Sequence, residues 1–122
     1  MKQILYDNNN IFAKIIRGEI SCKKLDECHH TLTFYDINPQ APIHLLVIPK
    51  GAYVDIDDFS VKASVQEQAA FVAAIGRAAK LVGASDNGYR VISNVGGFGH
   101  QEVPHLHVHI LGGEPIGPLR SH

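Results

Sequence analysis

Charge of one sign, cysteine and long apolar runs are all scarce in this chain. Its 122 residues carry a formal net charge of −1, which gives no general reason to expect binding to nucleic acid or to a membrane surface. No apolar run approaches the length of about 18 residues that a membrane-spanning helix needs. The two cysteines, Cys22 and Cys28, lack CxxC spacing, so reduced thiols and a cytoplasmic location are expected.

The N-terminal segment has too short an apolar run, followed by too polar a stretch, for a signal peptide. We expect residues 1–9 to form a flexible tail and residues 10–122 to form one domain. A hydrophobic content of 45% and a charged content of 19% are typical of an ordinary globular protein.

Near the end of the chain, three histidines alternate with aliphatic residues. His105, His107 and His109 are separated by Leu106 and Val108, and this period of two predicts a strand with one aliphatic and one imidazole face. The outer two histidines would lie roughly 13 Å apart along a strand that rises about 3.3 Å per residue. Zinc–nitrogen bonds are only about 2.0–2.1 Å long, so one tetrahedral ion cannot use all three rings.

Three interpretations of this row remain from the residues alone. Two adjacent histidines could share a metal, although little in the sequence completes such a ligand set. The histidines could also be polar residues on the solvated face of a strand. An extended anionic substrate fits the row better, with a central nucleophile or base and a donor on either side.

The remaining elements follow from pattern and turn chemistry. Asn10 can cap a short helix that ends at Gly18, and strands are expected over residues 31–37 and 44–49, around the turn 38–42. An acidic loop over residues 55–60 precedes a long helix that Ser60 or Ser64 caps and that Gly83 ends. The apolar stripe of this helix is expected to comprise Val61, Val65, Ala69, Val72, Ile75, Ala79 and Val82. A further strand over residues 88–94 leads into the glycine-rich loop 95–101.

Four blocks of this sequence resemble the histidine-triad (HIT) nucleotide hydrolases and transferases, in their Hint branch. They are residues 11–20, 34–44, 88–94 and 105–113, in order and at matching spacing. The resemblance covers about residues 11 to 118, and Gln101-Glu102-Val103 with Gly117-Pro118 is similar to the bacterial members. It implies an α+β fold, a HIT-like domain that forms a homodimer. Its five-stranded antiparallel sheet would carry one short and one long helix on one side.

The resemblance also implies roles at the site. His107 would attack the α-phosphorus of a purine nucleoside 5′-phosphoramidate, while His105, His109 and Asn94 hydrogen-bond the phosphate oxygens. His44 would orient a neighbouring imidazole, and Asp36 would accept hydrogen bonds from the ribose hydroxyls. The wall of the purine pocket would comprise Phe12, Ile15, Ile20, Phe34 and Ile37. Gln101 and Glu102 are further substrate-binding candidates, and no metal or cofactor is required.

Two other functions remain open on the same residues. The triad could serve a dinucleoside polyphosphate hydrolase, or the chain could be a nucleotide-binding interaction module with incidental hydrolysis. Three positions depart from the usual pattern: His100 replaces a glycine, Pro104 an aromatic residue, and Glu114 a basic residue. The leaving-group preference is therefore the property that the family resemblance predicts least well.

Overall fold

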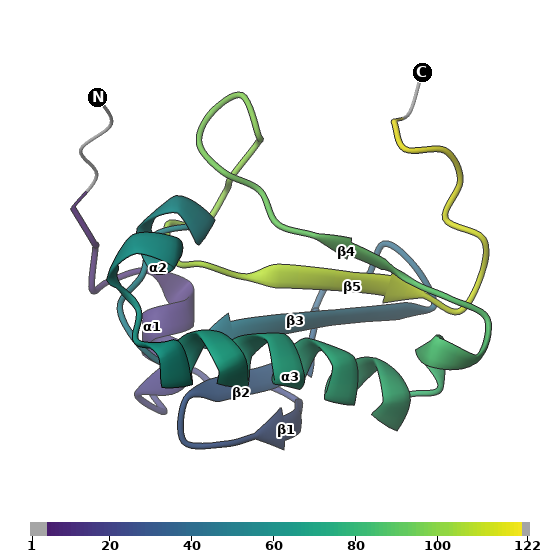
Figure 1. Ribbon diagram of the computed structural model, residues 1–122, viewed down its shortest axis with the longest axis horizontal. Coiled ribbons are helices and arrows are strands. Elements are labelled where there is room, and N and C mark those ends of the chain that lie inside the picture. Colours follow the sequence, from purple (N-terminus) through teal and green to yellow (C-terminus); the bar gives the residue numbers. More distant parts are fainter. Residues whose placement is uncertain (1–4, 121–122) are drawn as a thin grey trace.

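The computed structural model describes residues 5–120 (Figure 1). The regular elements follow one another in the order α1 (Ile11–Ile16), β1 (Lys24–Glu27), β2 (Thr31–Tyr35), β3 (Ile43–Pro49), α2 (Ile56–Lys62), α3 (Val65–Leu81), the 3₁₀ turn η1 (Ala84–Asp86), β4 (Arg90–Ile92) and β5 (Val108–Gly112). In this described part of the chain, no helix is both long and apolar enough to cross a membrane.

The five strands form one sheet in the order β1-β2-β3-β5-β4, and every neighbouring pair is antiparallel. The prediction of a five-stranded antiparallel sheet is therefore confirmed. Strand β3 lies at its centre, with Leu46 opposite His109 of β5 and Val47 opposite Val108. The most apolar strand and the strand that carries the end of the histidine row thus lie side by side.

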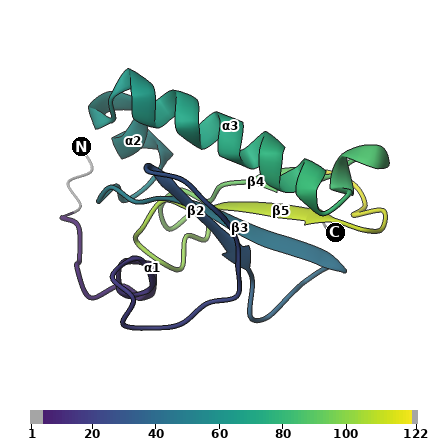
Figure 2. The same ribbon diagram turned by 90° about the horizontal axis from the view of Figure 1, so that it is seen from below.

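Two helical layers cover opposite faces of this sheet, so the prediction of helices on one side is wrong (Figure 2). Alternate residues of β3 explain the difference, because successive side chains of a strand point to opposite faces. Leu45 and Val47 pack with the α2 and α3 residues of one core cluster. Leu46 and Ile48 pack with Phe12 of α1 in the other. A strand that is apolar on both faces needs cover on both.

The segment expected as an acidic loop contains a third helix, α2. Its N-cap is Asp55, whose side chain accepts a hydrogen bond from the backbone N–H of Asp58, and Phe59 is its buried residue. Aspartate is both a good N-cap and favourable in the first helical turn, which explains why acidic residues begin a helix here.

Helix α3 begins as predicted, but only part of the predicted apolar stripe is buried. Ser64 and Glu67 form the expected capping box. Of the expected stripe, Ala79 is buried and Ile75 and Val82 pack against the core, but Val65 and Val72 are 79% and 70% exposed. Phe71, Ala74 and Ala78, which lie outside that stripe, are buried against the sheet. The small alanines allow the helix to lie close to the strands, and the larger valines are left on the outer side. Both cysteines are free thiols.

Candidate active site

The histidine row follows an irregular approach before it joins the sheet. Strand β5 begins only at Val108, so His105 and His107 lie before the strand rather than within it. Pro104 has no backbone N–H, and the N–H of Leu106 bonds the carbonyl of Tyr53 at 2.8 Å instead of a neighbouring strand. The prediction of a regular strand over the whole histidine row is therefore wrong for its first part. Only His109 lies within β5, so the three imidazoles have different surroundings.

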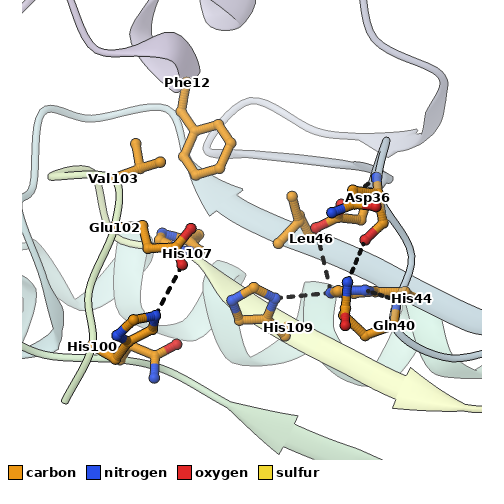
Figure 3. Close-up of a pocket in the computed structure, with 12 residues that line it drawn as sticks. Phe12, Asp36, Gln40, His44, Leu46, His100, Glu102, Val103, His107 and His109 are labelled. Atoms are coloured by element: carbon orange, nitrogen blue, oxygen red, sulfur yellow. Dashed lines mark hydrogen bonds and ion pairs between the residues drawn. The ribbon is translucent and has the colours of Figure 1, made fainter.

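His107 lies at the floor of a cavity, with one ring nitrogen held by the backbone. Its Nδ1 is 2.7 Å from the carbonyl oxygen of His105. Because a carbonyl only accepts, Nδ1 carries the proton and Nε2 keeps its lone pair. The side chain is nearly buried, and burial lowers the pKa of His107. The ring is therefore neutral near pH 7, with an unprotonated nitrogen in a side chain that lines the cavity (Figure 3).

His109 is oriented by a short chain of hydrogen bonds that begins at a backbone amide. The N–H of Gln40 donates to His44 Nδ1 at 3.0 Å, so His44 carries its proton on Nε2. That Nε2 donates to His109 Nδ1 at 2.9 Å and lies 3.4 Å from Asp36 Oδ2 (Figure 3). His109 therefore carries its proton on Nε2. Burial, followed by His107 and His44, lowers its pKa to about 4, so this ring is a neutral N–H donor beside His107.

The same hydrogen bonds disfavour a metal ion at this point. Asp36, His44 and His109 offer ligand atoms within 4.8 Å of one another. A neutral imidazole has one nitrogen lone pair, and the lone pair of His44 accepts the N–H of Gln40. To ligate through Nε2, His44 would have to lose its remaining proton or give up this bond. These residues do not fit a resident metal in the observed arrangement.

His105 does not occupy the position that the sequence predicted for it. Its side chain is fully buried, and it is not among the residues that line the cavity. Nε2 is 2.9 Å from the carbonyl oxygen of Pro49, and Nδ1 is 2.6 Å from the hydroxyl of Tyr6. Both ring nitrogens are thus engaged, which leaves neither for a phosphate oxygen. His105 contributes through its carbonyl, which orients His107.

Tyr6 was not expected from the sequence, because it lies in the segment assigned to a flexible tail. Residues 1–4 of that segment lie outside the described residues, whereas Tyr6 is half-buried against His105. The carbonyl of Pro49 requires a proton on His105 Nε2, so Nδ1 must accept and the hydroxyl of Tyr6 donates. Nothing local in the sequence indicates this pairing, since the two residues are 99 positions apart.

The cavity has a volume of about 490 Å³ and lies on the α1 side of the sheet (Figure 3). Seven of the predicted site residues line it: Phe12, Asp36, His44, Asn94, Glu102, His107 and His109. Five further lining residues were not predicted: Asn38, Gln40, Leu46, His100 and Val103. The apolar residues, with Phe12 and Leu46 among them, provide a surface for a flat hydrophobic group, and the polar residues surround the reactive imidazoles.

The other predicted substrate-binding residues do not line the cavity. Phe34 is buried behind Phe12, with ring centroids 5.8 Å apart, and Ile15 packs on the same cluster. Ile20 is partly exposed, and Ile37 is fully exposed next to Asp36. The side-chain amide of Gln101 donates to two backbone carbonyls and its oxygen accepts the N–H of Gly96, so this residue holds the loop.

The charges around the cavity are unusual for a phosphate site. The lining residues that the structure describes include two carboxylates, Asp36 and Glu102, but neither lysine nor arginine. Burial lowers the pKa values of His44, His107 and His109, so none of these rings supplies a positive charge near neutral pH. The donors that these three rings offer to an anion are therefore neutral N–H groups.

The fold and site define an α+β protein with a neutral imidazole pair at the floor of a cavity over its central strands. The HIT domain family matches residues 17–116, and the chain belongs to this family.

Named relatives and solved structures cover nearly the whole chain. A HIT-like protein of Azospirillum brasilense is 57% identical over 93% of each chain. The purine nucleoside phosphoramidase of Escherichia coli (strain K12) is 40% identical over 92% of this chain and 93% of its own. A HIT family hydrolase from Legionella pneumophila Philadelphia 1 has a TM-score of 0.83 at 39% identity, covering 89% and 96% of the two chains. A histidine triad protein from Clostridium difficile has a TM-score of 0.82 at 38% identity, covering 95% of this chain and all of its own.

Proposed function

We propose that this protein hydrolyses the P–N bond of purine nucleoside 5′-phosphoramidates, with His107 as the nucleophile. The observation that carries the proposal is the state of His107, whose Nδ1 proton is held by the carbonyl of His105. A neutral imidazole with its Nε2 lone pair free in a cavity is an activated nucleophile that needs no separate base. The name of the Escherichia coli relative supports the choice of substrate class.

The reaction then has two displacements. In the first, His107 Nε2 forms a bond to phosphorus, the P–N bond breaks, and the departing amine nitrogen takes up a proton from solvent. In the second, a water oxygen bonds to phosphorus, the Nε2–P bond breaks, and the attacking water releases a proton to solvent. Over the cycle, water supplies the hydroxyl on phosphorus and the proton on the amine. The Nε2 proton of His109, with Asn94, hydrogen-bonds the phosphoryl oxygens as negative charge develops on them.

The remaining lining residues indicate where the nucleoside part of the substrate would bind. Asp36 accepts the backbone N–H of Asn38 through Oδ1 at 2.8 Å, which fixes the carboxylate at the cavity. A carboxylate is acceptor-only and can take both hydroxyl protons of a ribose. We assign the purine to the apolar surface around Phe12, which Phe34 supports from behind. Contacts of Ile20 and Ile37 with the base remain predictions.

A dinucleoside polyphosphate fits this cavity less well. Its leaving group carries several negative charges, and sites for such groups use arginine, lysine or a metal ion. Here the lining carboxylates of Asp36 and Glu102 would repel it, and the described lining offers no lysine or arginine. A phosphoramidate presents one phosphate charge and an amine, which neutral donors can accept.

A direct comparison of substrates tests the proposal. The purified protein should release AMP from an adenosine 5′-phosphoramidate with a kcat/KM at least 100-fold above that for diadenosine tetraphosphate. The reverse preference would assign the protein to the polyphosphate hydrolases. AMP binding with no turnover of either substrate would instead support a nucleotide-binding interaction module.

We also propose that the chain forms a homodimer. Strand β4 is an edge of the sheet, and Val91, opposite Ile110, is half-exposed on the α3 face. Val72 of α3 is 70% exposed, so the outer side of this helix also carries a large apolar side chain. An apolar surface beside an open strand edge suits a two-fold interface.

Sedimentation tests the dimer. At micromolar concentration the protein should have about twice its 13.3 kDa monomer mass, and Val72→Asp should shift it toward the monomer. A wild-type monomer at that concentration would contradict the dimer. A cytoplasmic location likewise remains a prediction, supported by the two free thiols.

A further inference from the structure

The rim of the cavity carries a pair of side chains that the proposed reaction has not yet used. His100 Nε2 lies 3.0 Å from Glu102 Oε1, and both residues line the cavity while remaining largely exposed (Figure 3). The carboxylate faces the reactive rings. Burial lowers the pKa values of His107 and His109, and the negative charges of Asp36 and Glu102 oppose that effect at both rings.

The loop that presents this pair has a fixed shape. The backbone N–H of His100 bonds the carbonyl of Gly97 at 3.1 Å, and the N–H of Gln101 bonds that of Gly96 at 3.0 Å. The side-chain amide of Asn94 donates to the carbonyl of Gly99 at 2.6 Å. A Cβ at Gly99 would lie 2.3 Å from the carbonyl oxygen of Val95, so the loop closes too tightly for any other residue there.

His100 itself has a backbone conformation that favours glycine. Its φ is 62°, and it is the one non-glycine residue with positive φ in the described chain. A residue with a Cβ is disfavoured in this left-handed region. The hydrogen bonds of the loop hold it there, and the result is an imidazole turned toward Glu102. A glycine at this position would have the easier backbone but no side chain to hold the carboxylate.

The position of the pair identifies which part of a substrate it meets. Figure 3 shows Asp36 and His44 on one side of His109, and His100 and Glu102 on the other side, next to His107. If the ribose binds Asp36, as the proposed function requires, the pair lies past the phosphorus. We propose that His100 and Glu102 form a subsite for the leaving amine, and that this subsite favours amines that carry a second, positively charged group.

Charge is the reason for this preference. A carboxylate beside a bound phosphate repels it unless a cation lies between or near them. The described lining contains no lysine or arginine to act as that cation. His100, 3.0 Å from Glu102, holds the carboxylate at the rim beside the position of the phosphorus. The missing positive charge can come from the substrate, as an ammonium or guanidinium group on the leaving amine.

Three matched substrates test the subsite. Adenosine 5′-phosphoramidates of 1,3-diaminopropane, 3-amino-1-propanol and β-alanine present a cationic, a neutral and an anionic end at similar length. The wild-type kcat/KM should rank them in that order, with each step up to about fivefold, the scale of an exposed charge pair. The ratio of cationic to neutral substrate should shrink as salt is raised, because salt screens exposed charges.

Variants then test whether His100 and Glu102 cause this ranking of substrates. Glu102→Gln should bring the ratio of cationic to neutral substrate to about one, and Glu102→Asp should retain a preference. His100→Asn should lower the ratio, since asparagine tolerates the left-handed backbone but cannot hold Glu102 in the same way. Asp86→Asn, an equal change of charge in the exposed turn η1 outside the cavity lining, should keep the wild-type ratio.

The possible failures can be told apart. If the wild type does not hydrolyse the neutral phosphoramidate, the proposed function itself is wrong. If all three substrates are hydrolysed without the ranking, or if Glu102→Gln keeps it, the subsite is wrong while the proposed function stands. An unchanged ratio in His100→Asn would remove His100 from the subsite, and a changed ratio in Asp86→Asn would trace the effect to overall charge.

Discussion

Replacing Tyr6 by phenylalanine removes one hydroxyl and leaves a buried acceptor, Nδ1 of His105, without a partner. The bond is 2.6 Å long, and His105 is fully buried. An unsatisfied buried polar group costs about 1–3 kcal/mol. With an unfolding entropy of about 2.1 cal/mol/K per residue, a chain of 122 residues loses about 4 °C in Tm per kcal/mol. We therefore expect Tyr6→Phe to lower Tm by about 4–12 °C.

Calorimetry and urea unfolding at pH 7.5 measure this effect. The urea midpoint should fall with an unchanged m-value, since the same surface is exposed on unfolding. Tyr89→Phe, at a partly exposed ring, is the matched control and should melt within about 1 °C of the wild type. Turnover by Tyr6→Phe should stay within about threefold, because neither ring nitrogen of His105 reaches the cavity. An unchanged Tm would contradict a stabilising hydrogen bond between Tyr6 and His105. A 100-fold loss of kcat in a stable variant would mean that His105 takes part in the reaction.

Three further predictions concern the reaction and its histidines. His107→Asn should retain less than about 1% of kcat while AMP affinity, measured by titration calorimetry, stays within about tenfold, because the ribose and base contacts lie elsewhere; substantial residual turnover would mean another nucleophile. Activity should survive exhaustive chelation with EDTA, because the lone pair of His44 already accepts the N–H of Gln40; a loss that zinc restores would revive the metal site. Burial lowers the pKa of His105 from 6.5 to about 4, so between these values the unfolded chain binds a proton that the folded chain does not. The titration of His105 alone should lower the free energy of unfolding by about 3 kcal/mol as pH drops from 6.5 to 4. An unchanged urea midpoint over that range would contradict this prediction.

Local chemistry in the sequence was enough to predict much of this protein. Ser64 and Glu67 at capping-box spacing marked the start of α3, and the structure has both hydrogen bonds. The alternation after His107 predicted a strand, and Val108 and Ile110 are buried in it. The four blocks of family resemblance predicted the fold and the family, to which the chain belongs. Each of these signals depends on residues close together in the chain or on an ordered pattern along it.

Such local signals could not predict which face of helix α3 is buried. Helix α3 has two apolar sides, one with Val65 and Val72 and one with Phe71, Ala74 and Ala78. Hydrophobicity favours the valines, but the sheet accepts the side whose small residues allow close approach. Similarly, whether α1 and α3 share a face depends on β3, whose residues are apolar on both sides.

The roles of the three histidines show the same limit at the site. In the sequence His105 and His109 flank His107 symmetrically, and the family resemblance predicts that both donate hydrogen bonds to the phosphate. The tertiary structure separates them, because Tyr6 and Pro49 occupy both ring nitrogens of His105. His109 has one nitrogen held by His44 and the other free to donate. A residue's place on a strand is a local property, but its free ring nitrogen depends on hydrogen-bond partners that only folding brings from distant parts of the chain.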